Sequence, residues 1–181
     1  MKIAFTGTHG TGKTTLTHDV AAALKKKGYD IGIVTEVARN CPFPINENTT
    51  ENSQLWISLN MINKELEIQQ KYEHIICNRS ILCAYAYTSN ILTKVTKPEI
   101  FKNLFEYWIN TYDVLLYTPI RYKLQKDLIR SDSEEFQRTI DDIIKKILNK
   151  NDIKFFEVPQ EDNINFIVTL FENQLKKNNL I

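Results

Sequence analysis

Residues 7–14 combine glycines, a lysine and a threonine in the order G-x-x-x-x-G-K-T. In such a loop, successive backbone N–H groups can converge on phosphate oxygens, and the side chain of Lys13 adds a full positive charge. The hydroxyl group of Thr14 is a ligand of the kind that Mg²⁺ prefers, because a hard cation binds oxygen. The pattern predicts a site for a nucleoside triphosphate, which we expect to be ATP, together with Mg²⁺.

The residues around this loop fit a phosphate site. The apolar run 3–5 predicts a buried strand before it, and the run 14–27 predicts a helix whose N-terminus would face the phosphates. A dinucleotide-binding loop is excluded, because its third glycine would fall at Thr15. His9 could lie near the γ-phosphate, although its place in a loop favours a solvent-facing side chain. The expected nucleotide contacts from this loop are His9, Gly10, Thr11, Gly12, Lys13, Thr14 and Thr15.

Strand-like runs alternate with helix-like runs along the whole chain, which predicts a parallel sheet covered by helices. We therefore expect an α/β fold: a three-layer P-loop arrangement with a five-stranded parallel sheet, similar to that of nucleotide kinases. No linker divides the chain, so a single domain over residues 1–181 is expected. The strand-like runs are 2–6, 30–35, 74–77, 113–117 and 153–158.

Further helices are expected between and after these strands. A long one should span residues 50–71, and we interpret its apolar stripe as a face toward the core. Another should begin near Thr96 or Pro98, and the last should span about 162–177. The stripe on the long helix consists of Leu55, Leu59, Ile62 and Leu66.

Ligands of open parallel sheets bind at the carboxyl ends of the strands, so residues just after each strand are candidates for chemistry. After the second strand, Glu36 could take a proton from an attacking hydroxyl group or support Mg²⁺ through water. Arg39 could bind an anionic part of an acceptor or pair with Glu36. The alternative is a surface ion pair, and the position of Glu36 favours function.

After the third strand, Asn78 stands where a carboxylate that supports Mg²⁺ would be expected. An amide oxygen can still bind a metal but brings no charge, which predicts weaker metal binding or weaker catalysis. Arg79 is a candidate for a phosphate or substrate contact, because its planar guanidinium matches phosphate oxygens. A structural salt bridge is the alternative for Arg79.

After the fourth strand, basic residues lie near a polar break in a helical pattern. This arrangement predicts a helical lid within residues 119–136, with a new helix near Glu134. Closure of the lid would bring Arg121 or Arg130 to the transferring phosphoryl group and exclude water. The alternative is a solvated helical hairpin.

The long helix expected over residues 50–71 also has a polar face. On it, Gln54 and Trp56 could recognise a base, the first by amide hydrogen bonds and the second by stacking. Partial burial of a tryptophan on a helix is the commoner case. Trp108 is expected in the core.

Composition limits the function classes. The chain is 43% hydrophobic and 25% charged, as in ordinary soluble globular proteins, and its net charge of +1 gives no general attraction to nucleic acid or anionic membranes. No apolar run approaches about 18 residues, so no membrane span is expected, and the start of the chain is unlike a signal peptide. Three cysteines without metal-type spacing predict reduced thiols and a cytoplasmic location.

Three short motifs carry a resemblance to a known group. They are G-x-x-G-x-G-K-T-T at residues 7–15, E-x-A-R at 36–39, and N-R-S at 78–80 in place of Asp-Arg-Ser. The chain resembles the small single-domain P-loop ATPases labelled as an AAA-type domain, which are similar to ribosylnicotinamide kinase and to deoxynucleoside and thymidylate kinases. Residues 130–141 also resemble the lid segment of these proteins.

The resemblance implies roles for particular residues. Glu36 would be the base that activates the acceptor, and Arg79 would contact the substrate. Arg121 and Arg130 would be lid arginines, and the adenine would lie in a loop near Pro159.

Together these observations predict an ATP- and Mg²⁺-dependent phosphotransferase that acts on a small nucleoside, nucleotide or related acceptor. The alternative is an ATP-binding regulatory protein that acts on a macromolecular partner, which Asn78 keeps open. A regulatory GTPase is nearly excluded, because the N-K-x-D at 149–152 precedes a strand and no glycine follows Gly32. A nucleic-acid motor would need a more basic surface, whereas a nucleic-acid end-kinase stays open. A homodimer is the default assembly.

Overall fold

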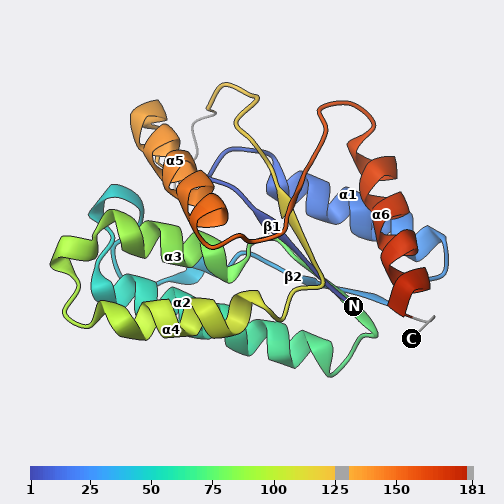
Figure 1. Ribbon diagram of the computed structural model, residues 1–181, viewed down its shortest axis with the longest axis horizontal. Helices are drawn as coiled ribbons and strands as arrows, with labels where there is room; N and C mark the ends of the chain where they lie inside the picture. Colours follow the sequence, from blue (N-terminus) through green and yellow to red (C-terminus); the bar gives the residue numbers. More distant parts are fainter. Residues whose placement is uncertain (125–130, 179–181) are drawn as a thin grey trace.

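The sheet is continuous and entirely parallel. The computed structural model describes residues 1–124 and 131–178, and within them five strands form one sheet in the order β2-β3-β1-β4-β5 (Figure 1). This confirms the predicted α/β architecture and places β1 in the centre, so that the loop after β1 begins in the middle of the sheet's carboxyl edge. The strands are β1 (Lys2–Thr6), β2 (Ile31–Val34), β3 (His74–Cys77), β4 (Val114–Tyr117) and β5 (Phe156–Glu157).

Helices cover both faces of the sheet, with α1 and α6 on one face and α2, α3, α4 and α5 on the other (Figure 1). Their bounds are α1 (Lys13–Lys26), α2 (Glu51–Gln69), α3 (Ile81–Asn90), α4 (Pro98–Ile109), α5 (Glu134–Lys150) and α6 (Asn163–Asn178). Three short 3₁₀ helices lie in the connections: η1 (Ala38–Asn40), η2 (Asn46–Asn48) and η3 (Leu92–Lys94). Among the described residues, no helix is both long and apolar enough to cross a bilayer.

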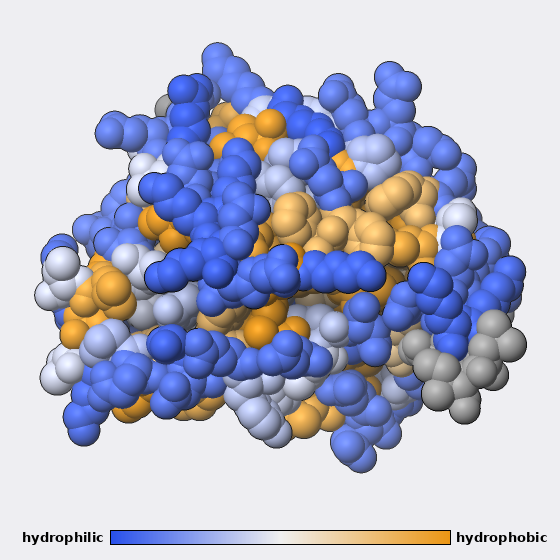
Figure 2. Space-filling model, in the orientation of Figure 1, coloured by the Kyte–Doolittle hydropathy of each residue, from blue (hydrophilic) through white to orange (hydrophobic). Residues whose placement is uncertain are grey.

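The core has two halves, one on each face of the sheet. Successive residues of a strand point to opposite faces, so Ala4 packs toward α3, α4 and α5, whereas Ile3 and Phe5 pack toward α1 and α6. Because both faces are covered, most strand residues are apolar, with polar residues such as Lys2 and Thr6 at the strand ends. The face of the molecule shown in Figure 2 is largely hydrophilic, with apolar side chains showing near the centre of the view and toward α6.

Helix α2 corrects one prediction from the sequence. The side chains of Leu59 and Leu66 are 50% and 47% exposed, so the leucine stripe is not the inward face. Instead the inward face of α2 is largely polar and includes Glu65. The carboxylate of Glu65 accepts hydrogen bonds inside the protein from Lys2 Nζ at 2.9 Å and Trp108 Nε1 at 2.8 Å. The buried residues of α2 are Ser53, Gln54, Ile57, Ser58, Met61 and Glu65.

The sequence located the starts of two helices and missed a third helix. Helix α4 begins at Pro98 as predicted, but the Thr96 N–H donates to a carboxylate oxygen of Glu51 at 3.0 Å, and the residue before the helix is Lys97. Helix α5 begins at Glu134 as predicted. Its N-terminus is capped by a serine hydroxyl. Helix α3 was not predicted at all.

The predicted lid falls partly outside the described residues. Residues 119–124 are described and form no helix, and the helical part of 131–136 is the first turn of α5. The prediction for Arg130 concerns residues 125–130, which lie outside the described part of the chain.

Candidate functional site

The loop between β1 and α1 has the backbone of a phosphate-binding turn. Gly7, Gly10 and Gly12 have φ angles of 147°, 73° and 81°. A side chain at Gly7 would also meet the carbonyl oxygen of Thr118, only 2.6 Å from where its Cβ would lie. The loop therefore requires glycine for both conformation and space, and α1 begins directly after it at Lys13.

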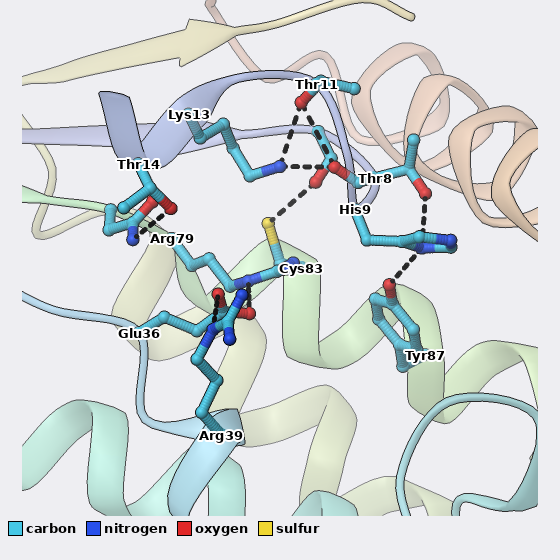
Figure 3. Close-up of polar contacts among 12 residues, drawn as sticks. Thr8, His9, Thr11, Lys13, Thr14, Glu36, Arg39, Arg79, Cys83 and Tyr87 are labelled. Carbon is cyan, nitrogen blue, oxygen red and sulfur yellow. Dashed lines mark hydrogen bonds and ion pairs between the residues drawn. The ribbon is translucent and has the colours of Figure 1, made fainter. Parts of the chain in front are cut away.

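Lys13 is held close to the loop that it follows. Its side chain is buried, and Nζ donates hydrogen bonds to the carbonyl of Thr8 and to Oγ1 of Thr11, the latter at 3.0 Å (Figure 3). The ammonium group thus sits over the turn where phosphate oxygens would be bound. This is the position from which a lysine can bridge terminal phosphates.

Two cavities adjoin this loop on the nucleotide side. The P-loop cavity, about 420 Å³ including space open to solvent, is bordered by residues 10–15 and by Glu36, Asn78 and Arg79. The α1–α6 cavity, about 1160 Å³ including space open to solvent, is bordered by Gly10, Gly12, Thr15 and the first residue of α6, among others.

Arg121 lies beside the α1–α6 cavity and does not border the P-loop cavity. Its guanidinium donates to the carbonyl of Val158 and lies 3.8 Å from the carboxylate of Glu157. Val158 borders the same cavity, while Pro159, which follows it, is not among the described residues that do. Arg121 is therefore placed at the α1–α6 cavity and is not among the described residues that line the P-loop cavity.

Glu36 lies between two arginines at the carboxyl edge of the sheet (Figure 3). Its Oε1 accepts a hydrogen bond from Arg79 Nε at 2.6 Å, and its Oε2 is 3.7 Å from Arg39 Nε. Although burial alone would lower it, the pKa of Arg79 is raised above its ordinary value by the Glu36 carboxylate. The salt bridge expected as the alternative for Arg79 is therefore present, and the same pair borders the P-loop cavity.

A third cavity lies on the other side of this ion pair. The α2–α3 cavity, about 530 Å³ including space open to solvent, is bordered by Glu36 and Arg79 together with residues of η1, α2 and α3. Gln54 of α2 is 2% exposed and borders it, whereas Trp56 packs against a small apolar cluster and is not among the described lining residues. The structure thus brings Gln54 to the site and leaves Trp56 beside it.

The expectation of a solvent-facing His9 is wrong. Its side chain is 2% exposed, and its ring lies 5.7 Å from that of Phe136. Nδ1 is 3.0 Å from the Tyr87 hydroxyl, and the His9 carbonyl accepts a hydrogen bond from Gln137 Nε2 at 2.7 Å. Helices α3 and α5 cover this part of the loop, which sequence spacing alone does not reveal.

Comparisons with known proteins agree with this architecture. The profile of a family described as an AAA domain matches residues 2–164. The chain belongs to this AAA domain family. No curated protein matches it in sequence.

Two solved structures resemble the fold of this AAA domain. One is described as deoxyadenosine kinase from M. mycoides with the products dCMP and a flexible dCDP bound; it is 22% identical, with a TM-score of 0.61, and the match covers 98% of this chain and 100% of that one. The other, the same kinase with bound dCTP, is 20% identical with a TM-score of 0.62 and the same coverage. The chain is thus a P-loop kinase or ATPase with a nucleotide-kinase-like fold.

Several residues of the AAA domain that the sequence analysis did not name border the cavities at the site. Asp19 and Asn163 border the α1–α6 cavity, and Tyr87 and Cys83 border the α2–α3 cavity. Burial raises the pKa of the Cys83 thiol, but the charges of Arg79 and Lys13 outweigh this and hold it below its usual value. Helix periodicity could have placed Asp19 near the loop, whereas the others depend on how α3 and α6 pack.

The donor set near Thr14 fits a Mg²⁺ ion held largely by a nucleotide. Asn78 Nδ2 donates to Thr14 Oγ1 at 3.1 Å, so an amide and a hydroxyl meet at the edge of the P-loop cavity. Among the described residues, no group of three or more His, Cys, Asp or Glu side chains is placed to hold a metal. Mg²⁺ is commonly bound through substrate phosphates with few protein ligands, which agrees with this arrangement.

Proposed function

We propose that this AAA domain transfers the γ-phosphoryl group of ATP to a hydroxyl group of a nucleoside, nucleotide or similar small acceptor. The observation that carries the proposal is that Glu36 and Arg79 border both the P-loop cavity and the α2–α3 cavity. A donor held by the P-loop and an acceptor in the α2–α3 cavity would therefore meet at one ion pair. The likeness to a deoxyadenosine kinase supports a nucleoside-type acceptor.

In this reaction the acceptor oxygen forms a bond to the γ-phosphorus while the bond to the bridging oxygen of ADP breaks. Glu36 takes the proton of the acceptor hydroxyl, and its contact with Arg79 fixes the direction of the carboxylate. Lys13 and Arg79 stabilise the negative charge on the phosphoryl oxygens. We infer that Arg39 contacts an anionic or polar part of the acceptor.

Thr14 would hold Mg²⁺, with Asn78 beside it, and Glu36 could support the ion through water. When bound, Mg²⁺ neutralises charge on the β- and γ-phosphates. The chain's own residues would position the groups: the glycine turn would bind the phosphates, and Thr15 would add a hydroxyl group to the α-phosphate. We infer that Arg121 acts on the nucleotide side, near the base.

Gln54 supports recognition of a base in the α2–α3 cavity. Its Nε2 donates to Thr49 Oγ1 at 2.6 Å, and its Oε1 has no hydrogen-bond partner among the described residues. A buried amide oxygen is expected to be paired, so a ligand that offers an N–H group there would complete it. An amino or imino group of a nucleobase is such a donor.

The test is ADP release in the presence of Mg²⁺ across nucleosides, nucleoside monophosphates and nicotinamide riboside. We expect acceptor-dependent ADP release that disappears in Lys13→Ala and persists in Lys26→Ala, which alters an exposed lysine of the same helix. Gln54→Leu should raise KM for the acceptor more than it lowers kcat. ATP binding without stimulation by any acceptor would contradict the kinase proposal and favour a regulatory protein that acts on a macromolecular partner.

A cytoplasmic location and a homodimer remain predictions from the sequence. Light scattering of the purified chain tests the second directly. A mass twice that of the chain would support it, and a monomer at working concentration would contradict it.

A further inference from the structure

Asn78 occupies a decisive place in the P-loop cavity. It follows the last residue of β3, is 4% exposed, and donates a hydrogen bond from Nδ2 to Thr14 Oγ1 at 3.1 Å. Thr14 is the residue whose hydroxyl would meet the metal. The side chain next to that hydroxyl is therefore uncharged.

The charges around the P-loop cavity are unbalanced. Among the described lining residues, Lys13 and Arg79 are positive and Glu36 is the carboxylate, so one positive charge is in excess. Glu36 is also engaged by Arg79 at 2.6 Å and faces Arg39 at 3.7 Å. The cavity thus favours a polyanion even before a metal ion arrives.

We propose that Asn78 sets the metal dependence of nucleotide binding: this site binds ATP with little help from Mg²⁺ and has little affinity for Mg²⁺ alone. The inference rests on the nucleotide site of the proposed function and deepens it. A carboxylate beside Thr14 would repel the bare triphosphate and attract the metal. The amide does neither, so the metal enters as a complex with the nucleotide.

The measurement is the ratio of the dissociation constants for ATP in excess EDTA and in saturating Mg²⁺, obtained by calorimetry. Asn78→Asp keeps the size of the side chain and adds one negative charge. We expect it to weaken binding without metal and to raise the ratio by about 10- to 100-fold, the scale of changes around metal ligands. Asn103→Asp, which makes the same change at an exposed position of α4, should leave the ratio as in the wild type.

Asn78→Ala separates charge from the hydrogen bond. It removes the contact with Thr14 but stays neutral, so its ratio should remain close to the wild-type value. The inference is overturned if the wild-type protein binds ATP only with Mg²⁺, or if Asn78→Asp folds and has the wild-type ratio. The wild-type ratio decides even if the aspartate variant does not fold, which thermal unfolding would reveal.

This outcome is distinct from that of the proposed function. The ratio is measured without an acceptor and without turnover. A chain that transfers no phosphoryl group could still show the expected ratio, and an active kinase could fail to show it.

Discussion

Two acid–base pairs, one partly buried and one fully buried, lie on the same side of the sheet and have different roles. Glu36 and Arg79 are joined at 2.6 Å with side chains 10% and 11% exposed, and Lys2 and Glu65 are joined at 2.9 Å with side chains 3% and 1% exposed. The distances are similar, but the first pair borders two cavities beside the P-loop. The surroundings of each pair therefore determine whether a ligand can reach it.

The Lys2–Glu65 pair is enclosed by aromatic side chains. The Glu65 carboxylate also accepts hydrogen bonds from Trp108 Nε1 and the Tyr112 hydroxyl, each at 2.8 Å. The Lys2 ammonium lies 4.4 Å and 4.7 Å from the centres of these two rings. Each charge has several partners inside the protein, which offsets the cost of removing it from water. This pair holds the fold together, whereas Glu36 and Arg79 remain within reach of a ligand.

The largest effect should come from Glu36→Gln. If Glu36 takes the acceptor proton, kcat should fall by about 10²- to 10⁴-fold, because the amide cannot act as a base. Because the freed Arg79 borders cavities that water can enter, the loss of stability should be smaller than for the enclosed pair. Kinetics with the acceptor that the ADP-release assay identifies, alongside thermal unfolding, measure both.

Glu99→Gln, at an exposed position of α4, is the matched control for the loss of a carboxylate. It should leave turnover and stability nearly unchanged. Wild-type turnover of Glu36→Gln would show that Glu36 does not take part in the reaction. The Glu36–Arg79 pair would then be structural, like Lys2–Glu65.

Glu65→Gln should show the reverse pattern. It leaves the Lys2 ammonium buried without a counter-charge, and breaking a buried pair in this way costs about 3–5 kcal/mol of unfolding free energy. Turnover per folded molecule should stay close to wild type. Chemical denaturation measures the first quantity and the kinase assay the second.

A double variant checks the cause of this loss. In Lys2→Met with Glu65→Gln the unpaired charge is gone, while the amide oxygen can still accept from one of the two donors, Trp108 Nε1 or the Tyr112 hydroxyl, which bond different oxygens of Glu65. Most of the lost stability should return. If the double variant is as unstable as Glu65→Gln, the loss of unfolding free energy comes from packing. The unpaired Lys2 charge would then not be its cause.

The two sites also differ in how far the sequence could predict them. The P-loop could be predicted from the sequence because its structure depends on neighbouring residues. Its glycines determine the backbone angles, and Lys13 lies at the start of the helix that follows directly. The places of Glu36 and Arg79 followed from the rule that strand ends meet at one edge of a parallel sheet. These predictions needed only the positions of the strands along the chain and the expectation that the sheet is parallel.

The rest depended on packing between distant segments. Hydrophobic spacing placed Leu59 and Leu66 inward, yet α2 turns Gln54 toward a cavity and Glu65 toward Lys2. A pattern of apolar residues cannot show that this helix buries Glu65, because two of the partners of that carboxylate lie on β1 and α4. The burial of His9 under α5 was invisible for the same reason.

Tyr112→Phe should have a moderate effect on the enclosed pair. The hydroxyl donates to Glu65 at 2.8 Å and accepts from the Ile81 N–H at 2.9 Å, so its removal leaves two groups short of a partner. We expect a loss of about 1–3 kcal/mol in unfolding free energy. Tyr107→Phe, in which the altered residue is 74% exposed, should stay within about 0.5 kcal/mol of wild type. Equal losses in the two variants would show that the hydroxyl of Tyr112 does not support the pair.

Arg39→Gln should have the smallest effect, and it tests what Arg39 adds to the Glu36–Arg79 pair. Arg39 Nε is 3.7 Å from Glu36 and its side chain is 35% exposed, so the ion pair itself should be worth no more than about 1 kcal/mol. If Arg39 only helps to orient Glu36, kcat should fall by less than about tenfold with KM unchanged. If it contacts the acceptor, as proposed, KM for the acceptor should rise while kcat stays close to wild type. Steady-state kinetics of Arg39→Gln and Arg79→Gln, measured side by side, distinguish these cases. Arg79 contacts Glu36 at 2.6 Å, so Arg79→Gln should lower kcat far more than Arg39→Gln does.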